Sequence, residues 1–177
     1  MESITEATLV TNHSEKQKFY FHPQAIVHAE TYFEMAVTTY KHLLPLLVSD
    51  NPSPDVAWKL WPICVNLSLS CEIILKLFFE IDKGKMGHGH LLYKDLFNKL
   101  SNDSQKKISD KMLVLVNNGS STDYTYDNFI NDLKKSENTF SYERYSFEVV
   151  PGNGHGLNVA FLFSFAEALI SLYKELK

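Results

Sequence analysis

Apolar residues recur at intervals of three and four along most of this chain, which is the period of an amphipathic α-helix. The first such stretch begins near Pro23, a residue suited to the first turn of a helix, and it ends before a break at 49–54 that is rich in Ser, Asp, Asn and Pro. The pattern predicts a helix over about 23–47, with Pro45 in a kink or in the last turn. Its periodic apolar residues are Ala29, Tyr32, Phe33, Ala36, Tyr40, Leu43, Leu44 and Leu47.

The second helical pattern, over about 56–81, is the most apolar part of the sequence. A helix that is apolar nearly all round belongs in the middle of a bundle. Pro62 predicts a kink near its start, and Gly84 after Lys83 predicts its end. One polar stripe interrupts the apolar surface at every fourth position, through Ser68, Glu72, Lys76 and Glu80.

The rest of the chain predicts shorter helices over about 91–100, from the caps Ser101 and Asp103 to Asn118, over 126–135, and over 157–176. In the last of these, the inward positions are Phe161, Phe165, Ala168, Leu169, Leu172 and Leu176. No segment has the alternation or length of a convincing strand. The sequence therefore predicts an all-α fold, a compact up-and-down helical bundle with additional short helices. It also predicts a weakly ordered lead-in over 1–21 and one domain over 22–177.

The charge balance narrows the possible partners. A net charge of −4 gives no overall attraction to nucleic acid or to an anionic membrane. The lysine pairs Lys106-Lys107 and Lys134-Lys135 have acidic neighbours, which is typical of solvated helix faces. There is no uninterrupted apolar run of the ~20 residues that a membrane span needs, and the polar N-terminal segment does not resemble a signal peptide. We therefore expect a cytoplasmic protein with no membrane partner.

Cys64 and Cys71 lie seven positions apart in the second predicted helix. Seven helical residues rise about 10.5 Å, whereas the Cα atoms of a disulfide lie within about 7 Å of each other. We expect two buried, reduced thiols, consistent with a reducing compartment.

Arg144 is the only arginine among the 17 Lys and Arg residues of the chain. A guanidinium offers a planar, permanently charged fork that stacks on rings and binds carboxylates or phosphates in a bidentate manner, which an ammonium cannot do. Its immediate neighbours supply four rings and two carboxylates: Phe140, Tyr142, Glu143, Tyr145, Phe147 and Glu148. Two interpretations stay open, a structural ion pair and a functional guanidinium.

Glu72 and Lys76 also allow two interpretations. A Glu that precedes a Lys by four residues is a favourable pair on a helix surface, worth about 0.2–0.5 kcal/mol. On a central, otherwise apolar helix, the same two side chains could instead line an internal cleft.

The histidines give no clear metal signature. His88-Gly89-His90 contains two histidines without a third ligand nearby, so we expect no metal and no other cofactor. His90 could accept backbone N–H groups at a helix start, or it could act as a general acid or base. His155 lies in the glycine-rich loop 151–156 before the last helix, where the helix dipole favours an anion. That loop lacks the Gly-Lys-Ser/Thr ending of a phosphate-binding loop.

In this order along the chain, three stretches resemble the HEPN family of helical domains, which is found in prokaryotic defence and toxin–antitoxin proteins. The first is 70–78, with Glu and Lys four residues apart, and the second is 89–97, with His-x-Leu at the start of the next helix. The third is 140–148, which is similar to an aromatic-Arg-Tyr-x-aromatic-Glu segment of some members. Together with the helical order, the resemblance covers roughly residues 21–176.

The resemblance implies a homodimer that binds or cleaves RNA or a nucleotide, with a cognate protein partner. Active members cleave RNA without metal, using an Arg followed about four to six residues later by His. Here Glu148 occupies the first of those positions, and His155 lies eleven positions after Arg144. The implied roles are Arg144 on the scissile phosphate and His90 or His155 in transfer of the 2′-hydroxyl proton, in a cleft lined by Glu72, Lys76, Tyr145 and Glu148.

Because the spacing from Arg to His departs from that of active members, the sequence leaves catalysis open. If the protein is active, we expect a metal-independent endoribonuclease. The alternative is a non-catalytic helical module for protein–protein interaction, in which the same polar residues only fix the packing. A bundle that binds small apolar molecules is a third and more remote option, which rests only on an aromatic content of 13%.

Overall fold

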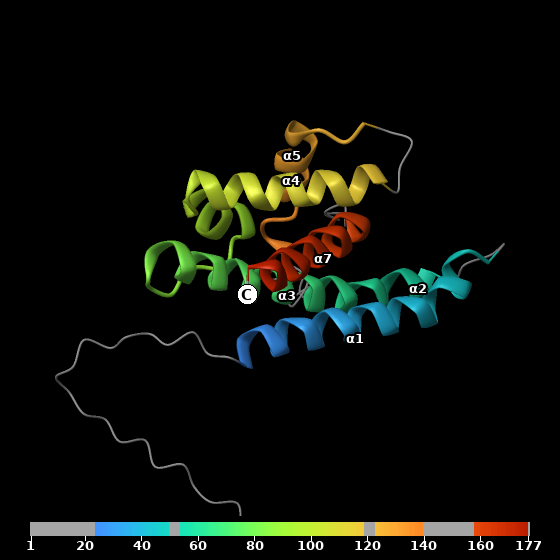
Figure 1. The fold of residues 1–177 in the computed structure, drawn as a ribbon. Coiled ribbons are helices and arrows are strands. Elements are labelled where there is room, and N and C mark those ends of the chain that lie inside the picture. The colour runs from blue at the N-terminus through green and yellow to red at the C-terminus, as the bar shows by residue number, and fades with distance from the viewer. Residues whose placement is uncertain (1–23, 50–53, 119–122, 140–157, 177) are drawn as a thin grey trace, which may run out of the picture.

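The computed structural model describes residues 24–49, 54–118, 123–139 and 158–176 (Figure 1). These residues form helices, turns and loops, and none of them forms a strand, which confirms the all-α prediction. Four of the predicted site residues, Arg144, Tyr145, Glu148 and His155, lie outside the described residues. So does the predicted N-terminal lead-in.

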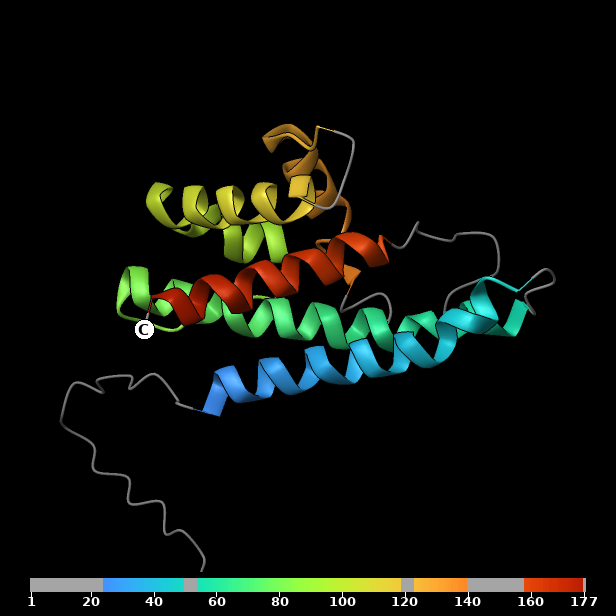
Figure 2. The ribbon, with the colours of Figure 1, turned by 45° about the vertical axis from the view of Figure 1, so that its right-hand side comes forward.

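The long helix α3, Leu60–Lys83, forms the centre of the fold. Helix α1, Gln24–Leu47, packs along one side of α3, and α7, Val159–Glu175, packs along another. In Figures 1 and 2 the chain directions show that α1 runs antiparallel to α3, whereas α7 runs parallel to it. The central position explains why α3 is apolar on most of its surface. Its fully buried apolar residues are Ile63, Cys64, Leu67, Cys71, Ile74, Leu75 and Phe78.

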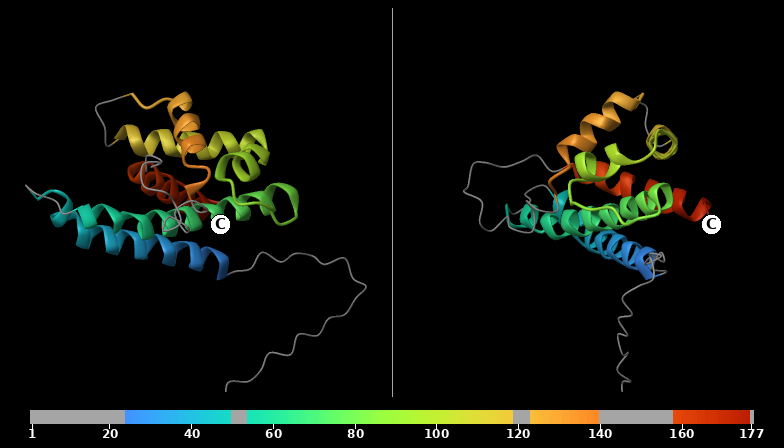
Figure 3. Two further views of the ribbon diagram at one scale, coloured as in Figure 1. Left: turned by 180° about the vertical axis from the view of Figure 1, so that it is seen from behind. Right: turned by 90° about the vertical axis from the view of Figure 1, so that its left-hand side faces the viewer.

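Helix α4, Asn102–Asn118, packs against α7, and α5, Tyr126–Lys135, lies against α4 (Figure 3). Phe129 of α5 is fully buried and joins these elements, because its ring centroid lies 5.4 Å from that of Phe97 and 5.7 Å from that of Phe165 on α7. The predicted inward positions of the last helix are confirmed except for Leu176, which is 48% exposed.

The helix predicted over 56–81 is divided in the structure. A short helix α2, Pro54–Trp58, precedes α3, and Lys59 forms a turn between them. Pro62 gives the physical reason, since its ring conflicts with a helical carbonyl four residues earlier, at Trp58. Pro62 was therefore expected to distort the helix at the right place, but the structure has a break between two helices there and not a kink in one helix.

The helix predicted over 91–100 is present, but it is not an α-helix. The chain forms a π-helical turn η1, Leu92–Leu96, followed by a 3₁₀ turn η2, Phe97–Lys99. The N–H of Phe97 is shared between the carbonyls of Leu92 and Tyr93. This turn buries Leu92, Leu96 and Phe97 together, so the apolar spacing that suggested an α-helix is also satisfied by a wider turn.

The start of α4 confirms Ser101 as a cap, whereas Asp103, the other predicted cap, lies inside the helix. The structure also adds a residue to this cap. The Ser101 hydroxyl accepts the N–H of Ser104 at 3.2 Å. Asp82, near the end of α3, accepts the N–H of Ser101 at 2.6 Å and the hydroxyl of Ser104 at 2.7 Å. Partial burial alone would raise the pKa of the Asp82 carboxyl, but the hydrogen bonds from Ser104 and Ser101 outweigh it and lower that pKa. Asp82 therefore ties α3 to α4.

Both cysteines are free and buried, as predicted, and burial raises the pKa of the Cys71 thiol far above its ordinary range. Among the described residues, α3 is also the one helix long and apolar enough to cross a membrane by length and composition, with 61% of its most apolar window buried inside the fold. No uninterrupted apolar run of that length is present in the sequence because Glu72 and Lys76 interrupt it.

Candidate functional site

Glu72 lies on α3 within the core of the fold and is only 4% exposed. Among the described residues, it is the only Asp, Glu or Lys in the buried class. A carboxylate is rarely buried unless it is paired, because the charged form loses its hydration. The contacts of Glu72 therefore define the most unusual polar site of the described chain.

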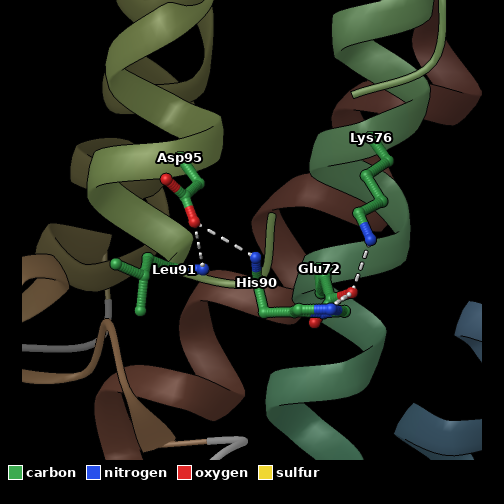
Figure 4. Close-up of polar contacts among 5 residues, drawn as sticks. All are labelled: Glu72, Lys76, His90, Leu91 and Asp95. Carbon is green, nitrogen blue, oxygen red and sulfur yellow. Dashed lines mark hydrogen bonds and ion pairs between the residues drawn. The ribbon is translucent and has the colours of Figure 1, made fainter. Parts of the chain in front are cut away.

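Two donors meet one oxygen of this carboxylate (Figure 4). Glu72 Oε1 lies 2.7 Å from Lys76 Nζ and 2.9 Å from His90 Nδ1. We call these three residues the Glu72 cluster. The Lys76 side chain is 21% exposed and that of His90 is 62% exposed, so the cluster extends from the core to the surface.

The carboxylate also defines the orientation of the imidazole. An ionised carboxylate only accepts hydrogen bonds, so His90 donates from Nδ1. In a neutral ring the other nitrogen, Nε2, is then the basic atom. The arrangement of a buried carboxylate behind an exposed histidine is one that orients a general base.

The loop before η1 holds His90 in this position. Asp95 Oδ2 accepts the backbone N–H groups of His90 and Leu91, each at 3.3 Å. Gly89 has φ +99°, and a Cβ at this position would overlap the Asp95 carboxylate. Burial alone would raise the pKa of Asp95, but the two amides and the nearby Lys99 outweigh it and lower that pKa.

This geometry corrects one expectation about His90. The sequence suggested that its imidazole could accept backbone N–H groups at a helix start. In the structure Asp95 accepts those groups, and the imidazole pairs with Glu72. Asp95 was not among the predicted site residues, although an Asp four residues after Leu91 is a recognisable signal for such a backbone contact.

The second oxygen of the Glu72 carboxylate is buried, and it has no hydrogen-bond partner among the described residues. Buried carboxylate oxygens normally have partners, and an unsatisfied one costs free energy. The cluster therefore has the capacity to accept one more hydrogen bond, next to an ammonium and an imidazole.

The end of the described segment 123–139 contacts the residues that follow His90. The carbonyl of Glu137 accepts the N–H of Leu92 at 3.3 Å. Leu92 lies two residues after His90. The ammonium of Lys134 lies 4.9 Å from the centroid of the Tyr93 ring. Arg144 follows Thr139, the last described residue of this segment, by five positions and lies outside the described residues.

The structure thus brings together three of the predicted site residues, Glu72, Lys76 and His90. The other four lie outside the described residues. In the part of the chain that the structure describes, no group of three or more His, Cys, Asp or Glu side chains could hold a metal ion. A cavity of about 380 Å³ lies elsewhere, between α4 and the start of α5, lined by Asn102, Gln105, Lys106, Ser109, Asp110, Leu113 and Tyr126.

Comparison of the chain with models of protein families, with curated proteins and with solved structures gives no match.

Proposed function

We propose that this protein is a HEPN-type helical domain that acts on RNA in a defence or toxin–antitoxin setting. The observation that carries the proposal is the contact of Glu72 with His90, at 2.9 Å. It joins two of the three sequence stretches on which the resemblance rests, 70–78 and 89–97. The third stretch, 140–148, directly follows Thr139, which is close in sequence to the Leu92 partner Glu137.

In the proposed reaction, His90 acts as the general base. Its Nε2 takes the proton of an RNA 2′-hydroxyl, and the 2′-oxygen attacks the adjacent phosphorus. The bond from phosphorus to the 5′-oxygen breaks, and the 5′-oxygen takes a proton from water, leaving a 2′,3′-cyclic phosphate and a 5′-hydroxyl. The His90 imidazolium then returns its proton to the solvent. Glu72 keeps the ring oriented and stabilises the imidazolium that forms. His155 is the alternative base under the same resemblance.

Arg144 would stabilise the charge that develops on the phosphate. A guanidinium can contact two phosphate oxygens at once, whereas an ammonium acts as a single point charge. Lys76 is less suited to that role because Glu72 already pairs with it at 2.7 Å. The proposal therefore gives Lys76 the task of compensating the buried carboxylate, and it reserves phosphate binding for the single arginine.

The test is cleavage of a mixed RNA pool by the purified full chain in EDTA, with wild type and Arg144→Lys compared. We expect metal-independent cleavage by the wild type and a loss of about 100-fold or more in the variant, which is the scale of a removed transition-state contact. Lys107→Ala, on the exposed face of α4, serves as the matched control and should cleave as the wild type does. Equal cleavage by all three proteins, or none by a folded wild type, would reject the proposed reaction.

A non-catalytic interaction module is the second candidate. The observation that favours it is that the Glu72 cluster is itself a network of one ion pair and one hydrogen bond, which could exist only to fasten the loop before η1 to α3. In that case His90 variants would lower thermal stability, and the folded wild type would show no turnover of RNA under any condition.

A further inference from the structure

The segment 83–94, which runs from the last residue of α3 through the following loop into η1, is basic throughout. It contains three lysines and two histidines but no Asp or Glu, whereas the whole chain has a net charge of −4. We call this segment the basic loop. All five of these side chains, Lys83, Lys85, His88, His90 and Lys94, are exposed. A local positive charge can attract an anion that the chain as a whole would repel.

The lysines of the basic loop are not used in ion pairs. None of the three lies within ion-pair distance of a carboxylate among the described residues. On α4, by contrast, all three lysines are paired, as Lys106–Asp110, Lys107–Asp103 and Lys111–Glu175. Asp82 and Asp95 flank the basic loop, but their carboxylates accept hydroxyl and backbone N–H groups. The ammonium groups of the basic loop are therefore available to an anion from outside.

The backbone of the basic loop is held against α3 at its glycines. The N–H of Gly84 donates to the carbonyl of Glu80 at 2.8 Å, which ends α3. Gly87 is buried so closely that a Cβ there would lie 3.2 Å from the ring of Phe79. The exposed side chain of Lys85 lies between these two anchored glycines. A backbone that is already ordered lowers the entropic cost of binding a ligand.

The basic loop also flanks the imidazole that the proposed reaction uses (Figure 4). Lys94 lies on η1, next to Asp95, which accepts the N–H of His90 at 3.3 Å. Glu72 contacts His90 at 2.9 Å, and Lys83 lies eleven positions after Glu72, which is about 16 Å further along the axis of α3. Phosphates follow one another about every 3.4 Å along one strand of a duplex. Only a strand of several nucleotides can therefore contact His90 and Lys83 at once.

We propose that the basic loop binds backbone phosphates of an RNA strand outside the scissile one, through Lys83, Lys85 and Lys94. Phosphate contacts position a strand without reading its bases. The substrate class is therefore a polynucleotide without a required sequence at these positions, and not a mononucleotide. Because it takes the bound strand to be the one that His90 cleaves, this assignment rests on the proposed function.

Binding of a strand that cannot be cleaved tests the assignment with the purified full chain. A short RNA in which every 2′-hydroxyl is methylated has no proton for a general base to remove, so it is bound but not cleaved. We expect Lys83→Gln/Lys85→Gln to weaken its binding by about tenfold. The slope of log K against log salt should fall by about 1.4, because each lost phosphate contact removes about 0.7. Lys94→Gln should lower the slope by about 0.7.

A matched control removes the same charge elsewhere. Lys106→Gln/Lys107→Gln takes two lysines from α4, and it should bind the strand with the wild-type affinity and slope. Lys83 also lies in the last turn of α3, where a cation is favourable for the helix alone. If the lysines serve only the end of that helix, the double variant at 83 and 85 will lose thermal stability but keep the wild-type slope, which would overturn the assignment.

Competition tests the substrate class. The unlabelled strand should displace a labelled one, whereas a nucleoside 5′-monophosphate in large excess should not. Displacement by the monophosphate, a slope change in the α4 control equal to that of the loop variant, or no binding by a folded wild type would each overturn the assignment.

The assignment and the proposed reaction fail separately. Lysine-dependent binding of the methylated strand by a wild type that cleaves no RNA would reject the reaction and keep the phosphate-binding residues. Cleavage that Arg144→Lys abolishes, together with binding that is insensitive to the loop lysines, would reject these residues and keep the reaction.

Discussion

Two ion pairs in this protein have the same spacing along a helix, the same order of acid before lysine and the same N–O distance, but they differ in burial. On α3, Glu72 pairs with Lys76 at 2.7 Å, and on α4, Asp103 pairs with Lys107 at 2.7 Å, each with the lysine four residues later. The side chains of the first pair are 5% and 21% exposed, whereas those of the second are 72% and 50% exposed. The sequence spacing brings the two side chains of each pair together, and their burial in the fold determines how much the pair contributes to stability.

The difference follows from hydration. On α4 both charges keep most of their water, so the pair adds little to stability. On α3 the carboxylate has lost its water, and it depends on Lys76 and His90 for compensation. A third residue joins only the buried pair, and this is the feature that makes the α3 pair a candidate site.

The largest expected effect on stability is at Lys76. Lys76→Met keeps the apolar stem but removes the ammonium from a buried carboxylate, so we expect a loss of about 2–4 kcal/mol in the free energy of unfolding. Lys107→Ala on α4 should cost no more than about 0.5 kcal/mol. Urea denaturation of both variants measures the two values, and similar values for the two variants would remove the distinction between the pairs.

Gly89→Ala should have the next largest effect. The backbone there has φ +99°, and the added Cβ would overlap the Asp95 carboxylate. We expect a loss of about 1–3 kcal/mol in the free energy of unfolding. Because Asp95 orders the amide of His90, the contact of His90 with Glu72 should weaken as well, which the chemical shifts of the imidazole in NMR spectra would report. Unchanged stability and unchanged shifts would show that the loop tolerates a side chain.

A smaller, pH-dependent effect is expected at Asp82. Its pKa is lowered in the folded protein from an ordinary value of 3.8. A lowered folded pKa means that the contribution to stability is present above about pH 4 and is lost as the pH falls through the folded pKa. Asp82→Asn should therefore cost about 1 kcal/mol near neutral pH, the usual value of a helix cap, and less at pH 3. Urea denaturation at both pH values measures this, and an equal cost at both would contradict the assignment.

The sequence predicted the long helices well because each has a clear period and clear ends. The helix predicted over 126–135 coincides with α5, whose capping residue Thr125 accepts the N–H of Asn128. The winding of the segment 91–100 could not be predicted, since buried Leu92, Leu96 and Phe97 fit an α-helix and a wide π turn equally well. Hydrophobic spacing identifies which residues are buried, and it does not measure how tightly the turn is wound.

The candidate site was predictable only in part. Glu72 and Lys76 could be recognised because their interval is local. The pairing of Glu72 with His90, by contrast, joins residues 18 positions apart, and it depends on how η1 packs on α3. The role of Asp95 depends on the positive φ of Gly89, which the Gly-His-Leu sequence permits but does not require.

The most direct measurement compares two histidines of one loop. His88 and His90 are two residues apart and both exposed, and the cluster contact to Glu72 belongs to His90. In the metal-free RNA cleavage assay, we predict that His90→Gln loses about 100-fold or more in rate, as expected for a removed general base, while His88→Gln keeps the wild-type rate. Equal rates for the two folded variants would contradict the claim that the Glu72 cluster is the functional site.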